Sequence, residues 1–126
     1  MFARSDTYTE IPTEHMFAPG VYCRKVFMQA GHVYIGKIHG HDHGNIVAQG
    51  CVSVFSEFED TVHRAYSMFV SPKGTKRALY AHEDTIWICV HPNPDNETDL
   101  VKLEERYIVP HYAALGWETP DIGRIE

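Results

Sequence analysis

Three histidines, His39, His41 and His43, recur at every second position in the segment HGHDH. Side chains at alternate positions of a β-strand point to the same face, so a strand here would present three imidazole rings together. Neutral imidazole binds transition metals through the lone pair of a ring nitrogen, and the spacing therefore favours a metal site. Histidines near a strand end are also commonly exposed or hydrogen-bonded to backbone, and this purely structural explanation stays open.

The segments that must position these histidines are short and rich in β-branched and aromatic residues. They are separated by small, polar or glycine-containing stretches of the kind found in turns, and they cover residues 21–28, 33–41, 45–49, 51–58, 61–70, 75–81 and 85–91. Because no long helix separates them, the pattern predicts an antiparallel all-β sandwich or barrel rather than βαβ units. His91 ends the last segment on the same strand face as Trp87 and Cys89.

The two ends of the chain lack this strand pattern. Residues 1–19 are polar and irregular, with prolines as breakers, and are expected to form an N-terminal arm. The spacing of apolar residues after a cap at Thr98 or Asp99 predicts one short helix. Residues 111–126 show no period and are expected to form a C-terminal tail, which leaves residues 20–110 as the barrel domain.

The composition excludes several classes of protein. A chain of 126 residues is expected to form one domain, and its net charge of -6 argues against nucleic acid as a partner. No apolar run approaches the roughly 18 residues that span a bilayer, so we expect a cytoplasmic protein without a membrane partner. Cys23, Cys51 and Cys89 lie far apart and are expected to be reduced thiols rather than a disulfide framework or zinc site.

Other chemical motifs fit this chain poorly. The segment H-x-H-D-H is one residue short of the H-x-H-x-D-H motif of metallo-β-lactamase-type hydrolases, whose fold needs a much longer chain. An H-E-x-x-H zinc helix is absent, and an HD-type phosphohydrolase would require a helical bundle. Glu83 and Asp84 could act as a paired acid and base, but a turn between two strands is the preferred interpretation.

Two segments, HGHDHGNIVAQG and SPKGTKRALYA, resemble the two motifs of the cupin family. The first motif has the form G-x5-H-x-H-x3,4-E-x6-G, and this chain supplies the H-x-H and the closing Gly50. The second has the form G-x5-P-x-G-x2-H-x3-N, and this chain supplies Pro72-x-Gly74. The resemblance covers residues 20–91 and is greatest to small single-domain cupins encoded by phages and prophages. It implies a double-stranded β-helix, the jelly-roll barrel, followed here by one short C-terminal helix.

The resemblance also implies a divalent transition metal in the barrel, with His39, His41 and His43 as its ligands. Imidazole suits Fe, Ni, Cu and Zn and is compatible with Mn, so these residues do not determine which metal it would be. No glutamate follows the H-x-H, and His43 is the candidate substitute for it. Arg77 stands where metal-binding cupins generally have histidine, and a guanidinium has no lone pair for a cation. Arg77 and His91 are therefore predicted to be ligand-binding residues.

Three functions stay open on these observations. The first is a metal-dependent dioxygenase, isomerase or lyase acting on a small molecule. The second is a non-catalytic ligand-binding or sensor module in which Arg77 binds a small anion. The third is a phage accessory or structural protein in which the barrel is a scaffold.

Two further expectations concern partners within and between chains. A buried Arg77 needs a counter-charge, supplied either by an anionic ligand or by a carboxylate such as Glu57, Glu59 or Glu83. The N-terminal segment SDTYTEI could add to the exposed sheet edge of another copy, and we expect a homodimer or a higher homo-oligomer.

Overall fold

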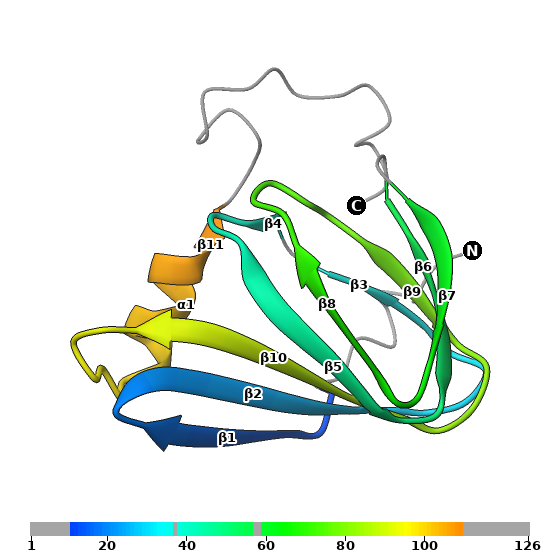
Figure 1. Ribbon diagram of the computed structural model, residues 1–126, viewed down its shortest axis with the longest axis horizontal. Coiled ribbons are helices and arrows are strands. Elements are labelled where there is room, and N and C mark those ends of the chain that lie inside the picture. The colour runs from blue at the N-terminus through cyan, green and yellow to red at the C-terminus, as the bar shows by residue number, and fades with distance from the viewer. Residues whose placement is uncertain (1–10, 37, 57–58, 110–126) are drawn as a thin grey trace.

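The computed structural model describes residues 11–36, 38–56 and 59–109, which fold into a barrel of two curved antiparallel sheets with a helix at one end (Figure 1). In chain order the elements are β1 (Thr13–Ala18), β2 (Gly20–Met28), β3 (Val33–Ile35), β4 (Ile38–His39), β5 (His43–Gln49), β6 (Cys51–Phe55), β7 (Asp60–Arg64), β8 (Ser67–Ser71), β9 (Ala78–Ala81), β10 (Thr85–Asn93), α1 (Leu100–Tyr107) and β11 (Ile108–Val109). The predicted all-β class with one short C-terminal helix is confirmed.

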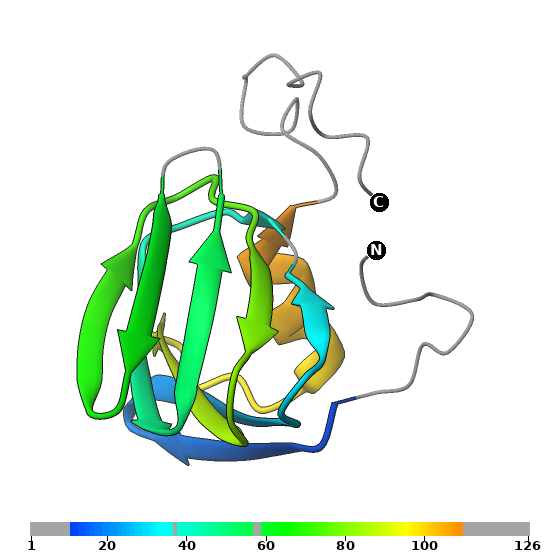
Figure 2. The same cartoon turned by 90° about the vertical axis from the view of Figure 1, so that its right-hand side faces the viewer.

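The larger sheet has the strand order β1-β2-β10-β5-β8, and the smaller has the order β3-β9-β6-β7, which faces the viewer in Figure 2. A third pair joins β4 to β11. Strand β10 lies between β2 and β5, so residues far apart in sequence become neighbours across the sheet. Consecutive strands such as β5 and β6 lie in different sheets. This alternation closes the barrel.

The strands are shorter than the sequence pattern predicts at several places. The predicted strand 75–81 is reduced to β9, so Thr75 and Arg77 lie in the loop before it. The predicted strand 33–41 is divided into β3 and β4, and the predicted strand 61–70 is divided into β7 and β8 by a bend at Ala65 and Tyr66. Strand β1 lies within the expected N-terminal arm and pairs with β2 of the same chain. Among the described residues, no helix has the length and apolar content needed to cross a membrane.

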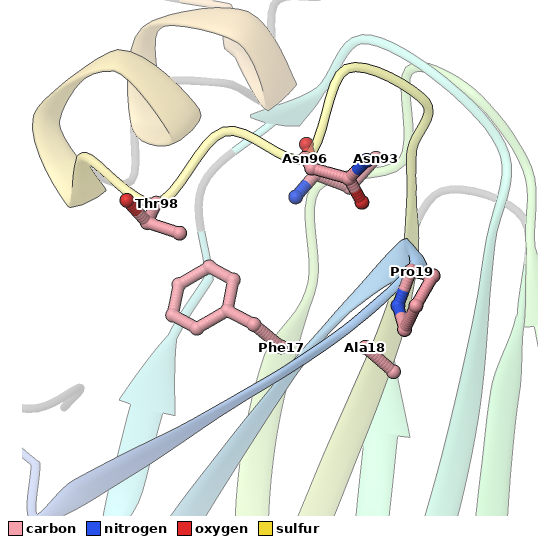
Figure 3. A pocket seen from close by; sticks show the side chains of 6 residues that line it. All are labelled: Phe17, Ala18, Pro19, Asn93, Asn96 and Thr98. Atoms are coloured by element: carbon pink, nitrogen blue, oxygen red, sulfur yellow. The ribbon is translucent and has the colours of Figure 1, made fainter.

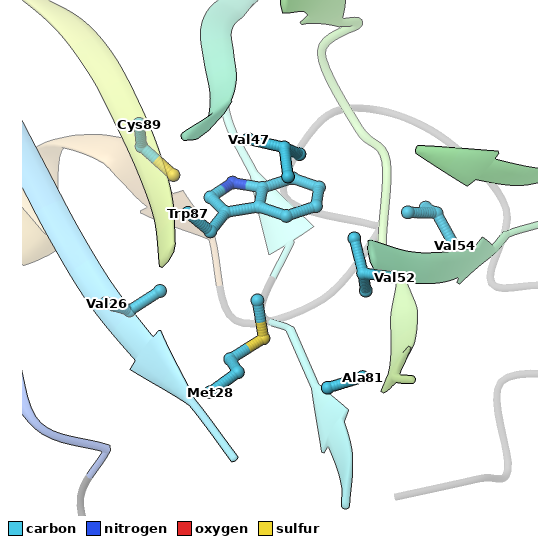
Figure 4. Packing of buried hydrophobic residues seen from close by; sticks show 8 residues of the cluster. All are labelled: Val26, Met28, Val47, Val52, Val54, Ala81, Trp87 and Cys89. Carbon is cyan, nitrogen blue, oxygen red and sulfur yellow. The ribbon is translucent and has the colours of Figure 1, made fainter. Parts of the chain in front are cut away.

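The core between the sheets is formed by inward-facing residues that the strand alternation places together (Figure 4): Val26, Met28, Val47, Val52, Val54, Ala81, Trp87 and Cys89. Trp87 lies at the centre of the larger sheet, opposite Val26 of β2 and Val47 of β5. Its indole Nε1 donates a hydrogen bond of 3.0 Å to Asn45 Oδ1, so the one polar atom of this ring is satisfied. Burial of this apolar surface stabilises the barrel that carries the histidines.

Gly50 joins β5 to β6 where the chain passes from one sheet to the other. Its φ is +93°, and a Cβ at this position would lie 2.4 Å from the backbone oxygen of Asp84 and 2.5 Å from Thr85 Oγ1. Gly50→Ala is therefore expected to lower the free energy of unfolding by about 2 kcal/mol or more, through backbone strain and overlap together.

Gly31→Ala is the matched control for this prediction. Gly31 also has a positive φ, +84°, but nothing lies within 4 Å of a Cβ built there. The free energy of unfolding of this control should therefore fall only by the cost of backbone strain, about 1–2 kcal/mol. Denaturant unfolding measures both variants, and equal losses would show that overlap with Asp84 and Thr85 contributes nothing.

Candidate functional site

Four histidines gather where β4, β5 and β10 approach one another. His39 ends β4, His43 begins β5, and His91 lies in β10. His41 lies in the bend between β4 and β5, so the three alternate histidines do not share one strand as the spacing predicts. Their rings converge because the chain bends at this point, and the distant strand β10 adds His91 beside them.

The distances between the ring centroids show how close this cluster is. His43 lies 4.2 Å from His39 and 5.0 Å from His91, and His39 and His91 are 5.6 Å apart. His41 lies 5.2 Å from His91, and its Nε2 is 3.1 Å from His91 Nδ1, so one of these rings donates a hydrogen bond to the other. Fold contacts alone therefore bring four imidazole rings together in one cluster.

Two backbone segments hold the bend that carries His41. In the Pro72-x-Gly74 turn, Gly74 N donates to the backbone oxygen of His39 at 2.9 Å, and Lys73 N donates to Asp42 Oδ1 at 2.7 Å. On the other side, Gly40 N donates to the backbone oxygen of Tyr107 at 2.7 Å. The Pro72-x-Gly74 turn of the second sequence motif thus holds the histidine segment of the first motif in place.

Burial keeps the four imidazoles neutral at physiological pH. Desolvation, assisted by neighbouring histidines and Arg77, lowers the pKa of His39 to about 2. Desolvation lowers the pKa of His43 to about 4 and that of His91 to about 3, and Arg77 adds to the effect at His43. Burial also lowers the pKa of His41, although Asp42 opposes this shift. Neutral rings keep the lone pairs that a metal needs.

His43 is the least satisfied member of the cluster. It is only 4% exposed, and neither Nδ1 nor Nε2 makes a hydrogen bond of normal length and angle, although the His41 backbone and the Asn45 side chain lie close enough to act on its pKa. A buried polar atom without a partner costs about 1–3 kcal/mol, and in a native structure such an atom calls for an explanation such as a bound ion or water. His43 is therefore the strongest indication that a ligand belongs here.

The four imidazoles are ligands that suit a transition metal, but their ring nitrogens do not point toward one common position. Within the described ranges, no three His, Cys, Asp or Glu side chains are placed together as a metal-binding set. The hydrogen bond between His41 and His91 occupies two of the nitrogens. Rotation about the side-chain torsions of histidine, whose terminal torsion has broad minima, would redirect these atoms. The residues therefore fit a metal chemically.

Arg77 lies in the loop before β9 and is 7% exposed, and its charge acts on His39 and His43 of this cluster. Its Nη1 donates to Ser71 Oγ, and its guanidinium carbon lies 5.2 Å from the centre of the Trp87 ring. Burial lowers its pKa, and the Glu59 charge opposes that shift. Arginine nevertheless stays protonated in proteins, so the barrel interior contains a fixed positive charge.

The carboxylates expected to neutralise Arg77 are engaged elsewhere or lie outside the described residues. Glu83 forms an ion pair of 3.2 Å with Arg64, and Glu59 lies 3.7 Å from His63 Nε2. Glu57 is outside the described residues. In the part of the chain that the structure describes, no carboxylate is within ion-pair distance of Arg77.

Asn45 and Ser71 connect Arg77 to the core, and sequence reasoning did not identify them. Asn45 Nδ2 donates to Ser71 Oγ at 2.7 Å, and Asn45 Oδ1 accepts from Trp87 Nε1 and, at 3.5 Å, from Cys89 Sγ. Asn45 is 1% exposed. Asn45 could have been identified from the sequence as a site residue, because it is a polar residue on the inward face of an apolar strand, two positions after His43.

Tyr107 covers the histidines from the side of α1. Asp99 caps this helix, as predicted, because its Oδ1 accepts from Val101 N at 2.9 Å. Leu103 and Tyr107, one helical turn apart, form the buried face of α1. The Tyr107 ring lies 4.7 Å from the His91 ring and 4.6 Å from the His41 ring. Its position on the apolar helix face could have shown that it is buried, but not that it contacts the histidines.

Two other features lie apart from this cluster. Glu83 and Asp84 lie in the bend between β9 and β10, as the preferred interpretation has it, and Asp84 Oδ1 accepts a hydrogen bond of 2.9 Å from the distant Ala30 N rather than from local backbone. A surface pocket of about 190 Å³ lies between the β1–β2 turn and the loop before α1 (Figure 3). Its lining contains no titratable side chain: Phe17, Ala18, Pro19, Asn93, Asn96 and Thr98.

Comparison with known proteins identifies the fold of this barrel. No family model and no curated protein matches the sequence. A cupin-2 domain protein from Shewanella frigidimarina matches the structure with a TM-score of 0.56 and 15% identity, covering 70% of this chain and 87% of that one. The chain has the cupin fold. The EutQ protein of Clostridium difficile also matches, with a TM-score of 0.56, 17% identity and coverage of 68% and 69%.

Larger cupin-fold proteins match over one part of their length. Salicylate 1,2-dioxygenase from Pseudoaminobacter salicylatoxidans matches with a TM-score of 0.56 and 18% identity, covering 71% of this chain and 24% of that one. The region that matches this chain therefore spans about a quarter of the dioxygenase chain. At such identities the likeness concerns the fold, and it confirms the jelly-roll barrel expected from the two sequence motifs.

Proposed function

We propose that this cupin binds a divalent transition metal through His39, His41, His43 and His91. The observation that carries the proposal is His43, a buried imidazole with no partner at either nitrogen, inside a cluster of neutral rings. A metal would use its lone pair and remove the cost of burying it unsatisfied. Fe, Mn, Ni, Cu and Zn all remain candidates, because imidazole is compatible with each of them.

Each protein group has a separate task in this site. The histidines hold the metal, and Tyr107 and Tyr22 exclude water from one side, since their rings lie 4.7 and 5.8 Å from His91. When bound, the metal supplies Lewis-acid or oxygen chemistry of the kind used by dioxygenases, isomerases and lyases. The Pro72-x-Gly74 turn keeps His39 and the His41 bend in place.

Arg77 supports a second component of the function, a small anionic ligand. Its guanidinium is buried near the histidines without a described counter-ion. The planar guanidinium group binds carboxylate or phosphate through two parallel hydrogen bonds. Salicylate 1,2-dioxygenase, which has been solved in complex with gentisate, is by its name an enzyme acting on an aromatic carboxylate. That neighbour agrees with a small carboxylate as the ligand class here.

The remaining functions are distinguished by metal content and turnover. Stoichiometric metal with turnover of a small carboxylate supports a metal-dependent enzyme. Anion binding without metal supports a ligand-binding or sensor module. If the protein shows neither turnover nor anion binding, that result supports the phage accessory or scaffold role. This role and the cytoplasmic location stay predictions, and so does the homodimer, since most of the segment SDTYTEI lies outside the described residues.

The test of the metal site is the double variant His39→Ala with His41→Ala. It is expected to bind metal at least about 10-fold more weakly than the unchanged protein while keeping a folded barrel, because these rings lie outside the apolar core cluster. Elemental analysis of protein purified without an affinity tag measures the metal, and circular dichroism measures the fold.

His32→Ala is the matched control, because His32 is exposed and its ring hydrogen-bonds to the nearby backbone oxygen of Ala30. It should keep the metal content of the unchanged protein. Full metal content in the double variant would show that the site has been misplaced.

A further inference from the structure

A second arginine, Arg24, lies on the inward side of strand β2. Side chains two residues apart in a strand point to the same face, so Arg24 shares its face with Tyr22 and Val26. Tyr22 packs on the buried face of α1 and Val26 belongs to the main core, which makes this the inward face of the sheet. Tyr22 and Val26 are buried, whereas Arg24 between them is exposed. The inward face therefore presents a cation to solvent at this position.

The strand register connects Arg24 to the polar residues around Arg77. Arg24 lies directly opposite Cys89 of β10, and Cys89 lies opposite Asn45 of β5. Asn45 Nδ2 donates to Ser71 Oγ, which also accepts a hydrogen bond from Arg77 Nη1. Adjacent strands lie about 4.8 Å apart, so the backbones at Arg24 and Asn45 are separated by about 10 Å across β10. A molecule of a few carbon atoms that lies over Cys89 can therefore reach both guanidinium groups.

The two arginines act on the same part of strand β10. Burial raises the pKa of the Cys89 thiol, and the charges of Arg77 and Arg24 both oppose that shift. Desolvation lowers the pKa of His91, and the neighbouring histidines and Arg24 add to this effect. The inward face of β10 thus lies in the positive field of both guanidinium groups.

Neither arginine has a carboxylate partner in the part of the chain that the structure describes. The ion pairs found there use other cations, namely Lys25, His63, Arg64 and Arg106. The chain as a whole has a net charge of -6 and repels small anions, so an anion binds only where positive charge is concentrated. Two unpaired guanidinium groups that face one interior provide that concentration, and two carboxylates would neutralise both of them.

We propose that Arg24 is a specificity residue that binds the second carboxylate of a small dicarboxylate whose first carboxylate is bound by Arg77. The inference rests on the anion-binding role proposed above for Arg77 and narrows the ligand class from small anions to molecules with two carboxylates. The atoms between the two carboxylates lie along the inward face of β10, which also carries His91. Arg24 contacts the carboxylate nearer to solvent, and Arg77 contacts the buried one.

Isothermal titration calorimetry of the full chain with dicarboxylates and their monomethyl esters tests this assignment. Succinate, glutarate and adipate cover a range of lengths, and each ester has the same carbon chain with one negative charge fewer. The unchanged protein should bind at least one of the diacids about 10-fold or more tightly than its ester, as expected for one additional charge-assisted hydrogen bond. Arg24→Gln should bind that diacid and its ester equally, with the ester affinity unchanged. Because Arg24 is exposed, its circular dichroism spectrum should not change.

Lys25→Gln is the matched control for the loss of one positive charge. Lys25 is the next residue of β2, so its side chain lies on the opposite face of the sheet, where it pairs with Glu14 at 3.1 Å. This variant should keep the preference for the diacid, and loss of the preference here as well would overturn the proposal by showing an effect of net charge alone.

The remaining outcomes separate this inference from the proposed role of Arg77. Equal affinity of the unchanged protein for every diacid and its ester would overturn the role of Arg24 and leave Arg77 as the anion site. Binding of neither kind of probe would overturn both roles. A preference for the diacid that persists in Arg24→Gln would show that another group binds the second carboxylate, and would overturn the proposal.

Discussion

Lowering the pH from about 7.5 to about 5.5 is expected to remove several kcal/mol from the free energy of unfolding of the metal-free protein. In the folded state the pKa is about 4 for His43, about 3 for His91 and about 2 for His39, against the ordinary histidine value of 6.5. Below pH 6.5 the unfolded chain therefore binds protons that the folded chain excludes, and stability falls as the pH falls toward the folded values. Each imidazole contributes on the order of 1 kcal/mol per pH unit in this range.

Thermal unfolding after removal of metal by a chelator measures this dependence. His91→Gln should reduce the loss by roughly a third, because His91 is one of the three imidazoles whose pKa is lowered most. Its matched control is His32→Gln, which removes a histidine at an exposed position outside the cluster. If His91→Gln and the unchanged protein lose stability in parallel, the cluster is not held neutral by burial.

Replacing Arg77 by Met is expected to abolish stabilisation by small anions without destabilising the free protein. At a ligand concentration of 100 times Kd, the unchanged protein should gain about 2.7 kcal/mol, and the variant should gain none. In the absence of ligand, Arg77→Met should be neutral or stabilising by about 1 kcal/mol or more, because it removes a buried charge that has no described counter-ion. Loss of the hydrogen bond to Ser71 offsets part of that gain.

Thermal shifts with a panel of small carboxylates and sugar phosphates measure both effects. Arg64→Met is the matched control, since Arg64 pairs with Glu83 at the surface and should not alter the response to anions. A large loss of stability in Arg77→Met without ligand would indicate an internal counter-ion, with Glu57 as the candidate. Anion responses that persist in this variant would exclude Arg77 as the binding group.

A second substitution at the same position tests its neighbourhood. Arg77→His places an imidazole where the second cupin motif has one, and its expected effect is a gain in metal affinity. The structure supports this, because the Arg77 charge lowers the pKa of both His39 and His43 and therefore acts on the same cluster. Unchanged metal affinity would place residue 77 out of reach of the metal.

The two cupin motifs could be recognised from the sequence because each is local. The H-x-H segment and the P-x-G turn each span only a few residues, and alternation of apolar residues marks the strands between them. Single residues such as Pro72 and Gly74 set the turn chemistry, and Asp99 sets the start of α1. Such features depend on neighbours in the chain, so the barrel class and the short helix followed from them.

The arrangement of the candidate site was decided only by tertiary contacts. His91 joins the other histidines because β10 pairs with β5, and Tyr107 covers them because β11 pairs with β4. His39, His41 and His43 converge through a bend held by Gly74 and Tyr107, not through one strand face. The sequence alone determined which side chains could bind a metal or an anion. The long-range pairing of strands decided which of them meet. The burial of Arg77 and the unpaired ring nitrogens of His43 exist only once the barrel has closed.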